Sequence, residues 1–170
     1  IARGMPPDFY ASAARLAILV VLPVTAVQMV WGSEFGVYVT DVQPMKIAAT
    51  EALWDTEQPA AFSLIQIGGF TVDDQTPTIE IASPGLLSFL STNSFKGEVV
   101  GMNELQDEAV QQYGPGKYIP DVRLTYWSMR VMAYFGTLML LLAVWGAWLL
   151  RRNKLEGAKW FQRAAMAGIA

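Results

Sequence analysis

The chain has 170 residues, of which 53% are hydrophobic and only 16% charged, and its formal net charge is −3. Its mean hydropathy of +0.30 is too high for an ordinary soluble domain and too low for a bundle made only of membrane helices. Cysteine and histidine are absent, which excludes disulfides, thiolate metal sites and histidine acid–base catalysis within these residues.

The charges are unevenly distributed. Residues 33–122 contain thirteen acids but only three bases, so this segment has a formal charge of −10, and the other nine bases lie in the flanks. A strongly acidic segment repels phosphate backbones, so we expect no nucleic-acid partner. The chain starts at Ile1 and ends on the apolar run MAGIA, which indicates a piece of a longer protein.

The first hydrophobic stretch covers residues 11–31 and reads ASAARLAILVVLPVTAVQMVW. Arg15 and Gln28 are its only strongly polar members, and 21 residues are enough to cross a hydrocarbon layer of ~30 Å. Pro23 removes one helical hydrogen bond and should kink the helix. The alternative is a buried helix of a soluble protein.

The second hydrophobic stretch, residues 126–150, reads YWSMRVMAYFGTLMLLLAVWGAWLL and carries a single charge, Arg130. As a helix it would be about 37 Å long, enough to cross the membrane with some tilt. Three tryptophans lie towards its two ends, where amphipathic rings prefer the headgroup region: Trp127, Trp145 and Trp148. The pattern predicts a transmembrane helix.

The flanking bases predict the orientation. Arg3 and Arg15 precede or begin the first span, and five bases follow the second, so the positive-inside rule puts both flanks in the cytoplasm. The predicted fold class is a mainly α integral membrane protein with two full transmembrane helices, the start of a third and a ~90-residue mixed extracytoplasmic loop. The predicted segments are 1–32 (first span), 33–122 (loop), 123–150 (second span) and 151–170 (cytoplasmic turn and start of a further span).

Within the loop we expect short helices around a hairpin. Asp41 can cap a helix over 43–54 that has Pro44 in its first turn. The runs FSLIQI (62–67) and TIEIA (78–82) are typical of strands. Two further helices are predicted, GLLSFLS (85–91) and ELQDEAVQQY (104–113), the second capped by Asn103 and stopped by Gly114-Pro115-Gly116.

The second span contains two residue types with chemical potential. An arginine inside a membrane costs free energy unless it is paired or reaches the interface, so Arg130 indicates either function or snorkelling. The thioethers of Met129, Met132 and Met139 are soft ligands that could bind haem iron, although most methionines on an apolar helix face lipid or core. The spacing alone does not select Met132.

Lys46 and Glu51 lie on the loop helix nearest the membrane. Five residues rotate an ideal helix by about 500°, so their side chains point about 140° apart and do not form an intrahelical ion pair. They could line two sides of a pocket, with Glu51 accepting a proton and Lys46 orienting a polar head group. The alternative is a solvated pair on an amphipathic helix.

Three runs carry a family resemblance: QPMKIAATEALWDTEQPAAF (43–62), LLSFLSTNSFKGEVVGMNELQ (86–106) and YGPGKYIPDVRLTYWSMRVM (113–132). Together they resemble subunit I of cytochrome bd-type quinol oxidases. The resemblance covers nearly this whole chain, which corresponds to about a third of such a subunit. It implies a helix, an external quinol-binding loop (Q-loop) of the short kind, and a helix with a haem ligand.

The resemblance also implies roles for individual residues. The lysine and glutamate of the family's K-x-A-A-x-E stretch, here Lys46 and Glu51, are associated with quinol binding and oxidation. The methionine of the W-S-x-R-x-M stretch, here Met132, is an axial ligand of the low-spin haem b iron. Arg130 is expected near the propionates of that haem or near the quinol site.

Further expectations concern the rest of the subunit. The family's histidine ligands, its high-spin haem b and its haem d would lie outside this chain, so the chain alone is expected to be inactive. The implied partners are ubiquinol or menaquinol, the remainder of subunit I, subunit II and the lipid of a bacterial or archaeal cytoplasmic membrane. Ser33 and Val37 depart from the family pattern at the start of the loop.

A different class of protein would share the hydropathy and the charge asymmetry. A membrane-anchored sensor or interaction protein could carry residues 33–122 as an extracytoplasmic binding domain. Such a protein has no reason to place an arginine and a methionine inside the second span beside a Lys/Glu helix.

Overall fold

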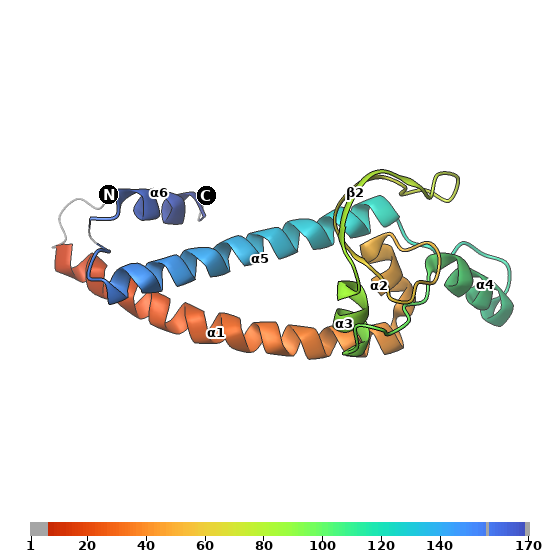
Figure 1. Cartoon of the computed structure of the whole chain (residues 1–170), viewed down its shortest axis with the longest axis horizontal. Coiled ribbons are helices and arrows are strands. Elements are labelled where there is room, and N and C mark those ends of the chain that lie inside the picture. Colours follow the sequence, from red (N-terminus) through yellow and green to blue (C-terminus); the bar gives the residue numbers. More distant parts are fainter. Residues whose placement is uncertain (1–6, 156, 169–170) are drawn as a thin grey trace. The chain divides into compact units, whose positions relative to one another are not determined.

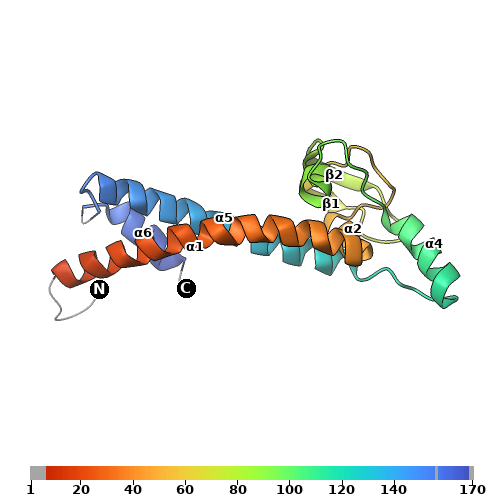
Figure 2. The same cartoon turned by 90° about the horizontal axis from the view of Figure 1, so that it is seen from below.

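The computed structural model describes residues 7–155 and 157–168 of the chain. Most of these residues are helical, as predicted. The elements in order are α1 (Pro7–Val42), α2 (Pro44–Glu51), β1 (Phe62–Gly68), β2 (Pro77–Ser83), α3 (Leu86–Thr92), α4 (Met102–Tyr113), α5 (Val122–Arg151) and α6 (Lys159–Ala167). Figure 1 labels all of them except β1, which is labelled in Figure 2.

Two of the described helices, α1 and α5, are long and apolar enough to cross a membrane. Only 6% and 17% of their most apolar windows are buried within the chain, whereas the core helix of a soluble protein would be mostly buried. The two predicted spans are therefore confirmed as candidate membrane helices. Lys159–Ala167 forms the short helix α6 at the position where a third span was expected to start.

The first helix is longer than the sequence predicted, because it runs through Gly32 to Val42. Asp41 consequently lies within α1 and does not cap α2, so that prediction was wrong. The backbone N–H of Gln43 still donates to Val39 O at 2.8 Å, and the helix stops only where Pro44 has no N–H to continue it. Pro44 does stand in the first turn of α2, as expected.

The chain divides into two compact units. The first comprises residues 1–30 and 133–170. Its small core contains Ile18, Leu149 and Leu155, with Phe161 of α6 packed against them. A Cβ atom at Gly146 would lie 2.8 Å from Ile18 Cδ1, so the helices approach closely where this residue has no side chain.

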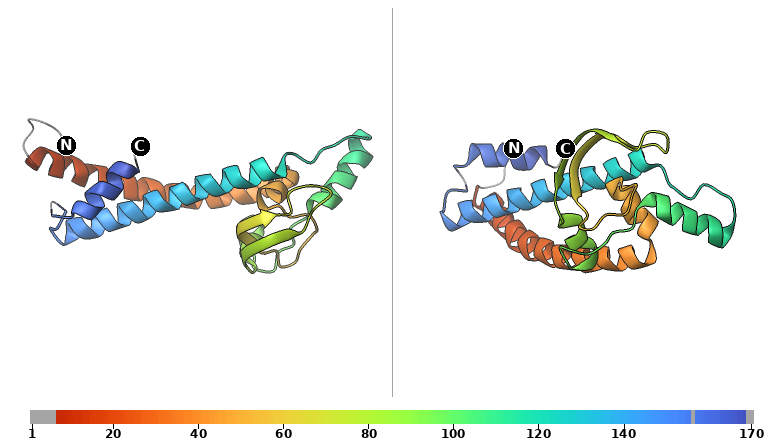
Figure 3. Two further views of the ribbon diagram at one scale, coloured as in Figure 1. Left: turned by 90° about the horizontal axis from the view of Figure 1, so that it is seen from above. Right: turned by 45° about the vertical axis from the view of Figure 1, so that its right-hand side comes forward.

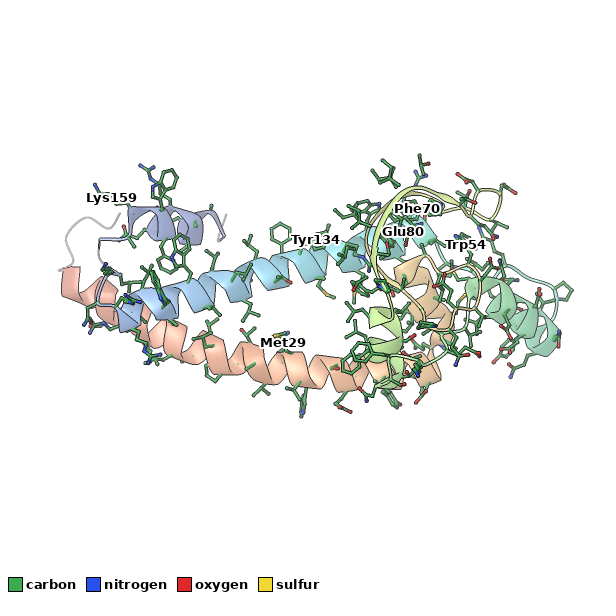
Figure 4. All side chains as sticks on the ribbon, in the orientation of Figure 1. Met29, Trp54, Phe70, Glu80, Tyr134 and Lys159 are labelled. Atoms are coloured by element: carbon green, nitrogen blue, oxygen red, sulfur yellow. The ribbon has the colours of Figure 1, made fainter. Side chains whose placement is uncertain are left out.

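The second unit, residues 31–132, contains the loop and has the larger core. The indole Nε1 of Trp54 donates to Gly69 O at 2.8 Å in its interior, and Figure 4 labels Trp54 and Phe70 within this unit. We call residues 31–132 the loop unit. Its core cluster consists of the buried apolar residues Ala48, Ala49, Ala52, Leu53, Trp54, Ala60, Phe70, Leu87, Val99, Met102, Leu105, Ile119, Val122 and Tyr126.

The strands β1 and β2 form an antiparallel hairpin (Figure 2), and both predicted strands are confirmed to within one residue at each end. Ser63 and Gln66 of β1 are buried, and the register shifts between Ser63 and Ile65. Such an irregularity re-aims side chains, and here it turns two polar residues of β1 towards the core.

The helices α3 and α4 complete the loop unit, and both are drawn in green in Figure 3. α4 begins at Met102 with Gly101 as its N-cap, so the predicted cap at Asn103 was wrong. The Asn103 amide instead donates to Asp55 Oδ1 at 3.0 Å and to Gln75 Oε1 at 3.1 Å. These tertiary bonds tie α4 to the loop, which explains why the local capping pattern did not decide the helix start.

Candidate functional site

A buried ion pair between Glu51 and Arg130 forms the centre of the loop unit. Arg130 Nη1 donates to Glu51 Oε1 at 3.0 Å and Nη2 donates to Oε2 at 2.6 Å, which is a bidentate pair. Glu51 is 7% exposed and Arg130 is 0% exposed. Arg130 therefore does not snorkel to the interface; it is paired inside the protein.

Two backbone carbonyls complete the surroundings of the guanidinium. Nη1 also donates to Thr50 O at 3.1 Å, and Nη2 donates to Ser63 O on β1. Glu51 and Ser63, which precede Arg130 by 79 and 67 positions in the sequence, thus both bind the side chain of this one residue of α5. Arg130 Nε is buried and has no hydrogen-bond partner among the described residues, so its N–H is an unsatisfied donor.

Small residues allow α2 to carry Glu51 this deep. Ala48 and Ala49 are fully buried, so the helix backbone approaches its neighbours closely. The helix ends directly after Glu51, because Ala52 adopts a left-handed conformation with φ of 52° and its N–H closes the last turn. Glu51 therefore sits in the final turn, on the face that packs inward.

Two aromatic rings enclose the guanidinium. The Cζ atom of Arg130 lies 4.6 Å from the ring centroid of Phe62 and 4.4 Å from that of Tyr126. The Tyr126 ring also packs 5.2 Å from the ring of Phe70. The ion pair is therefore shielded by apolar faces, and water is kept from it.

This enclosure changes the acidity of the carboxyl group. Burial raises the pKa of Glu51 from its ordinary value of 4.5 to about 7, and the hydrogen bond and charge of Arg130 and a backbone hydrogen bond from Ser63 oppose the rise without cancelling it. A carboxyl group with a pKa near neutrality can both take up and release a proton under physiological conditions.

Lys46 lies on a different face of α2, as the rotation between the two positions predicted. Its exposed side chain lines a groove of about 730 Å³, and Glu51 does not line that groove. The groove is formed by α2, α4 and the segments beside them, and its lining residues are Val42, Gln43, Pro44, Met45, Lys46, Leu105, Glu108, Ala109, Gln112, Tyr113, Tyr118, Pro120 and Thr125. The structure thus places Lys46 and Glu51 in one small helix but on separate surfaces.

Met132 is two residues beyond Arg130 on α5, so it lies about 160° around the helix from it. Its side chain is 62% exposed, whereas Arg130 is completely buried. The thioether is therefore accessible to groups outside this chain and does not contact the ion pair. Among the described residues no cluster of three or more His, Cys, Asp or Glu side chains could hold a metal ion.

Sequence reasoning missed Ser63, Phe62 and Tyr126. Tyr126 could have been found, because it precedes Arg130 by four residues on the same helix face. Ser63 and Phe62 gave no signal, because their contacts depend on how β1 packs against α5 in three dimensions.

Comparison with known proteins agrees with the family resemblance found in the sequence. A family model described as cytochrome bd terminal oxidase subunit I matches residues 2–170. The chain is also 39% identical over 165 residues to a protein of Bacillus subtilis (strain 168) named cytochrome bd ubiquinol oxidase subunit 1. The match covers 95% of this chain and 34% of that relative, so the chain spans about a third of its length.

Proposed function

The chain belongs to the cytochrome bd terminal oxidase subunit I family, and from that premise we propose that it is the quinol-oxidising segment of a membrane quinol:oxygen oxidoreductase. The observation that carries this proposal is the buried Glu51–Arg130 pair, which supplies a positioned carboxylate with a pKa of about 7 outside the two spans. Oxidation of a quinol releases two protons and two electrons. Glu51 takes one of those protons onto a carboxylate oxygen, and the other is released to water at the outer face.

Lys46 orients the quinol. The groove beside it falls within the ~300–1,000 Å³ range typical of small-molecule sites and is lined by apolar side chains with a few polar ones. An ammonium group at its wall can donate to a quinol oxygen. Lys46 and Glu51 face different sides of α2, and Glu51 does not line the groove. The lysine therefore holds the head group in the groove, and the proton of the reacting hydroxyl passes around the end of α2 to reach the buried carboxylate of Glu51.

Met132 and Arg130 serve the electron acceptor. The exposed thioether of Met132 would bind the iron of a low-spin haem b, whose other protein ligand would lie outside this chain. Arg130 would place a buried positive charge near an anionic group such as a haem propionate. The haem, when bound, supplies one-electron chemistry, and this chain holds it and keeps a compensating positive charge nearby.

The remaining assignments follow from the family and the charge pattern. We assign residues 33–122 to the outer face of a bacterial or archaeal cytoplasmic membrane, so that the proton leaves outwards. High-spin haem b and haem d belong to the remainder of subunit I, which together with subunit II completes the enzyme. Ubiquinol or menaquinol is the electron donor, and the 170 residues alone are inactive.

The test replaces Glu51 and Lys46 in the full-length protein. Glu51→Gln should lower the turnover of quinol oxidation by about 100-fold, because a general base contributes ~10²–10⁴-fold. Lys46→Ala should mainly raise the KM for quinol. The low-spin haem absorbance should stay near that of the parent protein in both variants.

Lys96→Ala and Glu57→Gln are matched controls outside the proposed site, and both should keep the parent's turnover and KM. Wild-type kinetics in Glu51→Gln and Lys46→Ala would remove these two residues from the quinol site. A full-length protein without any haem absorbance would instead support a membrane-anchored sensor.

A further inference from the structure

Ser63 touches both members of the ion pair through its main chain. Its carbonyl accepts a hydrogen bond from Arg130 Nη2, and its backbone N–H donates to the Glu51 carboxylate. A single residue of β1 therefore contacts both Glu51 and Arg130. The position of β1 decides whether the Glu51 carboxylate stays in its present orientation.

The side chain of Ser63 fixes that position. Its hydroxyl is hydrogen-bonded to the Tyr126 hydroxyl at 2.9 Å, 63 residues away in the sequence, and both residues are buried. Tyr126 lies one helical turn before Arg130, so its ring stacks on the guanidinium while its hydroxyl holds β1. We call the Ser63–Tyr126 hydroxyl pair the latch.

We propose that Ser63 and Tyr126 are positioning residues for quinol oxidation: the latch holds β1 on α5 and thereby keeps the Glu51 carboxylate oriented and dry for proton transfer. This proposal rests on the proposed function of Glu51. Neither residue of the latch lines the groove beside Lys46, so the latch acts on the proton acceptor and not on the docking of quinol.

The groups around Glu51 support this role. Within the part of the chain that the structure describes, the charged and titratable residues that face Glu51 are Arg130 and, beyond the guanidinium, Tyr126, both on α5. β1 contributes the main chain of Ser63 to Glu51 and the ring of Phe62 to the guanidinium. Loosening β1 would admit water, which lowers the pKa of Glu51, and would remove one backbone donor, which raises it. Because burial is the largest cause of the raised pKa, the pKa of Glu51 would fall towards its ordinary value.

The experiment compares Tyr126→Phe, Ser63→Ala and the double variant in the full-length protein, with Tyr38→Phe as the matched control. Each single variant leaves a buried hydroxyl without its partner and should lower the thermal midpoint of the assembled protein. The double variant removes both hydroxyls and should recover that midpoint. Tyr38 is exposed and serves to show that loss of a tyrosine hydroxyl alone has no effect.

Kinetics separate positioning from stability. All three latch variants should lose turnover by about fivefold with KM for quinol unchanged, and the acidic limb of their pH profile should move about 0.5 pH unit lower. The double variant should keep these defects although its stability recovers. If kinetics recover together with stability, or if the singles retain the parent's turnover and pH profile, the latch has no positioning role.

A parallel measurement on Glu51→Gln separates a failure of the latch from a failure of the proposed function. An inactive Glu51→Gln with wild-type kinetics in the latch variants overturns the latch alone. An active Glu51→Gln overturns the proposed function and the latch with it. Should Tyr126→Phe fail to assemble, Ser63→Ala and the double variant give the same decision.

Discussion

The pairing of Arg130 with Glu51 explains how a charged residue is tolerated near the start of a membrane helix. An unpaired buried charge costs several kcal/mol, and a bidentate partner with additional carbonyl acceptors offsets that cost. Arg130 has all of these: one carboxylate and the carbonyls of Thr50 and Ser63. The same arrangement keeps a carboxyl group buried at a pKa of about 7, which an exposed glutamate would not have.

Part of this site could be predicted from residue spacing. The divergence of Lys46 and Glu51 follows from 100° of helix rotation per residue, and the structure confirms it. The choice between snorkelling and pairing for Arg130 could not be made, because the partner lies 79 residues away. Spacing within one element is visible in a sequence, whereas the approach of β1 to α5 is not.

The assignment of Met132 gives a prediction with a spectroscopic readout. Met132→Ala in the full-length protein should abolish the low-spin haem b band in the reduced-minus-oxidised spectrum, because alanine offers no ligand atom. Met139→Ala is the matched control, since Met139 is similarly exposed on the same helix and should leave that band intact. A low-spin band that persists in Met132→Ala would exclude this sulfur as the ligand.

The helices and strands themselves were largely predictable, and their ends were not. Hydrophobic periodicity and β-branched runs placed all the elements within 44–113, but Asp41 and Asn103 do not cap helices. Both errors have the same cause. A capping pattern is local, and it gives way when a preceding helix continues, as in α1, or when tertiary bonds recruit the side chain, as at Asn103.

The start of α4 supplies a prediction about packing. A Cβ atom at Gly101 would lie 2.4 Å from the Asp55 carbonyl carbon and 2.5 Å from Trp54 O, so Gly101→Ala must push the start of α4 away from residues 54–55. We expect a loss of about 1–3 kcal/mol in the free energy of unfolding, as for other overpacked sites. The measurement is the thermal midpoint of the purified full-length protein.

Gly32→Ala is the control for Gly101→Ala. Gly32 lies within α1, and a Cβ atom there meets nothing within 4 Å. Alanine should therefore be neutral or slightly stabilising, by up to about 1 kcal/mol. Equal midpoints for Gly101→Ala and the parent would show that α4 does not pack this tightly on residues 54–55.

At the scale of the molecule, the chain combines two apolar helices with an acidic loop that has its own core. The loop unit contains Glu51, the proposed proton acceptor, and the groove, and α5 carries Arg130 and Met132 on opposite faces. This separation is what the proposed quinol oxidation requires, because protons and electrons would leave in different directions. Hydropathy and charge alone could not predict it, because they fit a membrane-anchored sensor equally well.

The central claim is that Glu51 accepts a quinol proton as a buried carboxylate, and the pH dependence of quinol oxidation tests it most directly. The base must be ionised before it can accept a proton, so turnover of the full-length protein should fall as the pH drops below about 7, the pKa of Glu51. The residual turnover of Glu51→Gln should lack this acidic limb. An acidic limb of the same midpoint in both proteins would contradict the account.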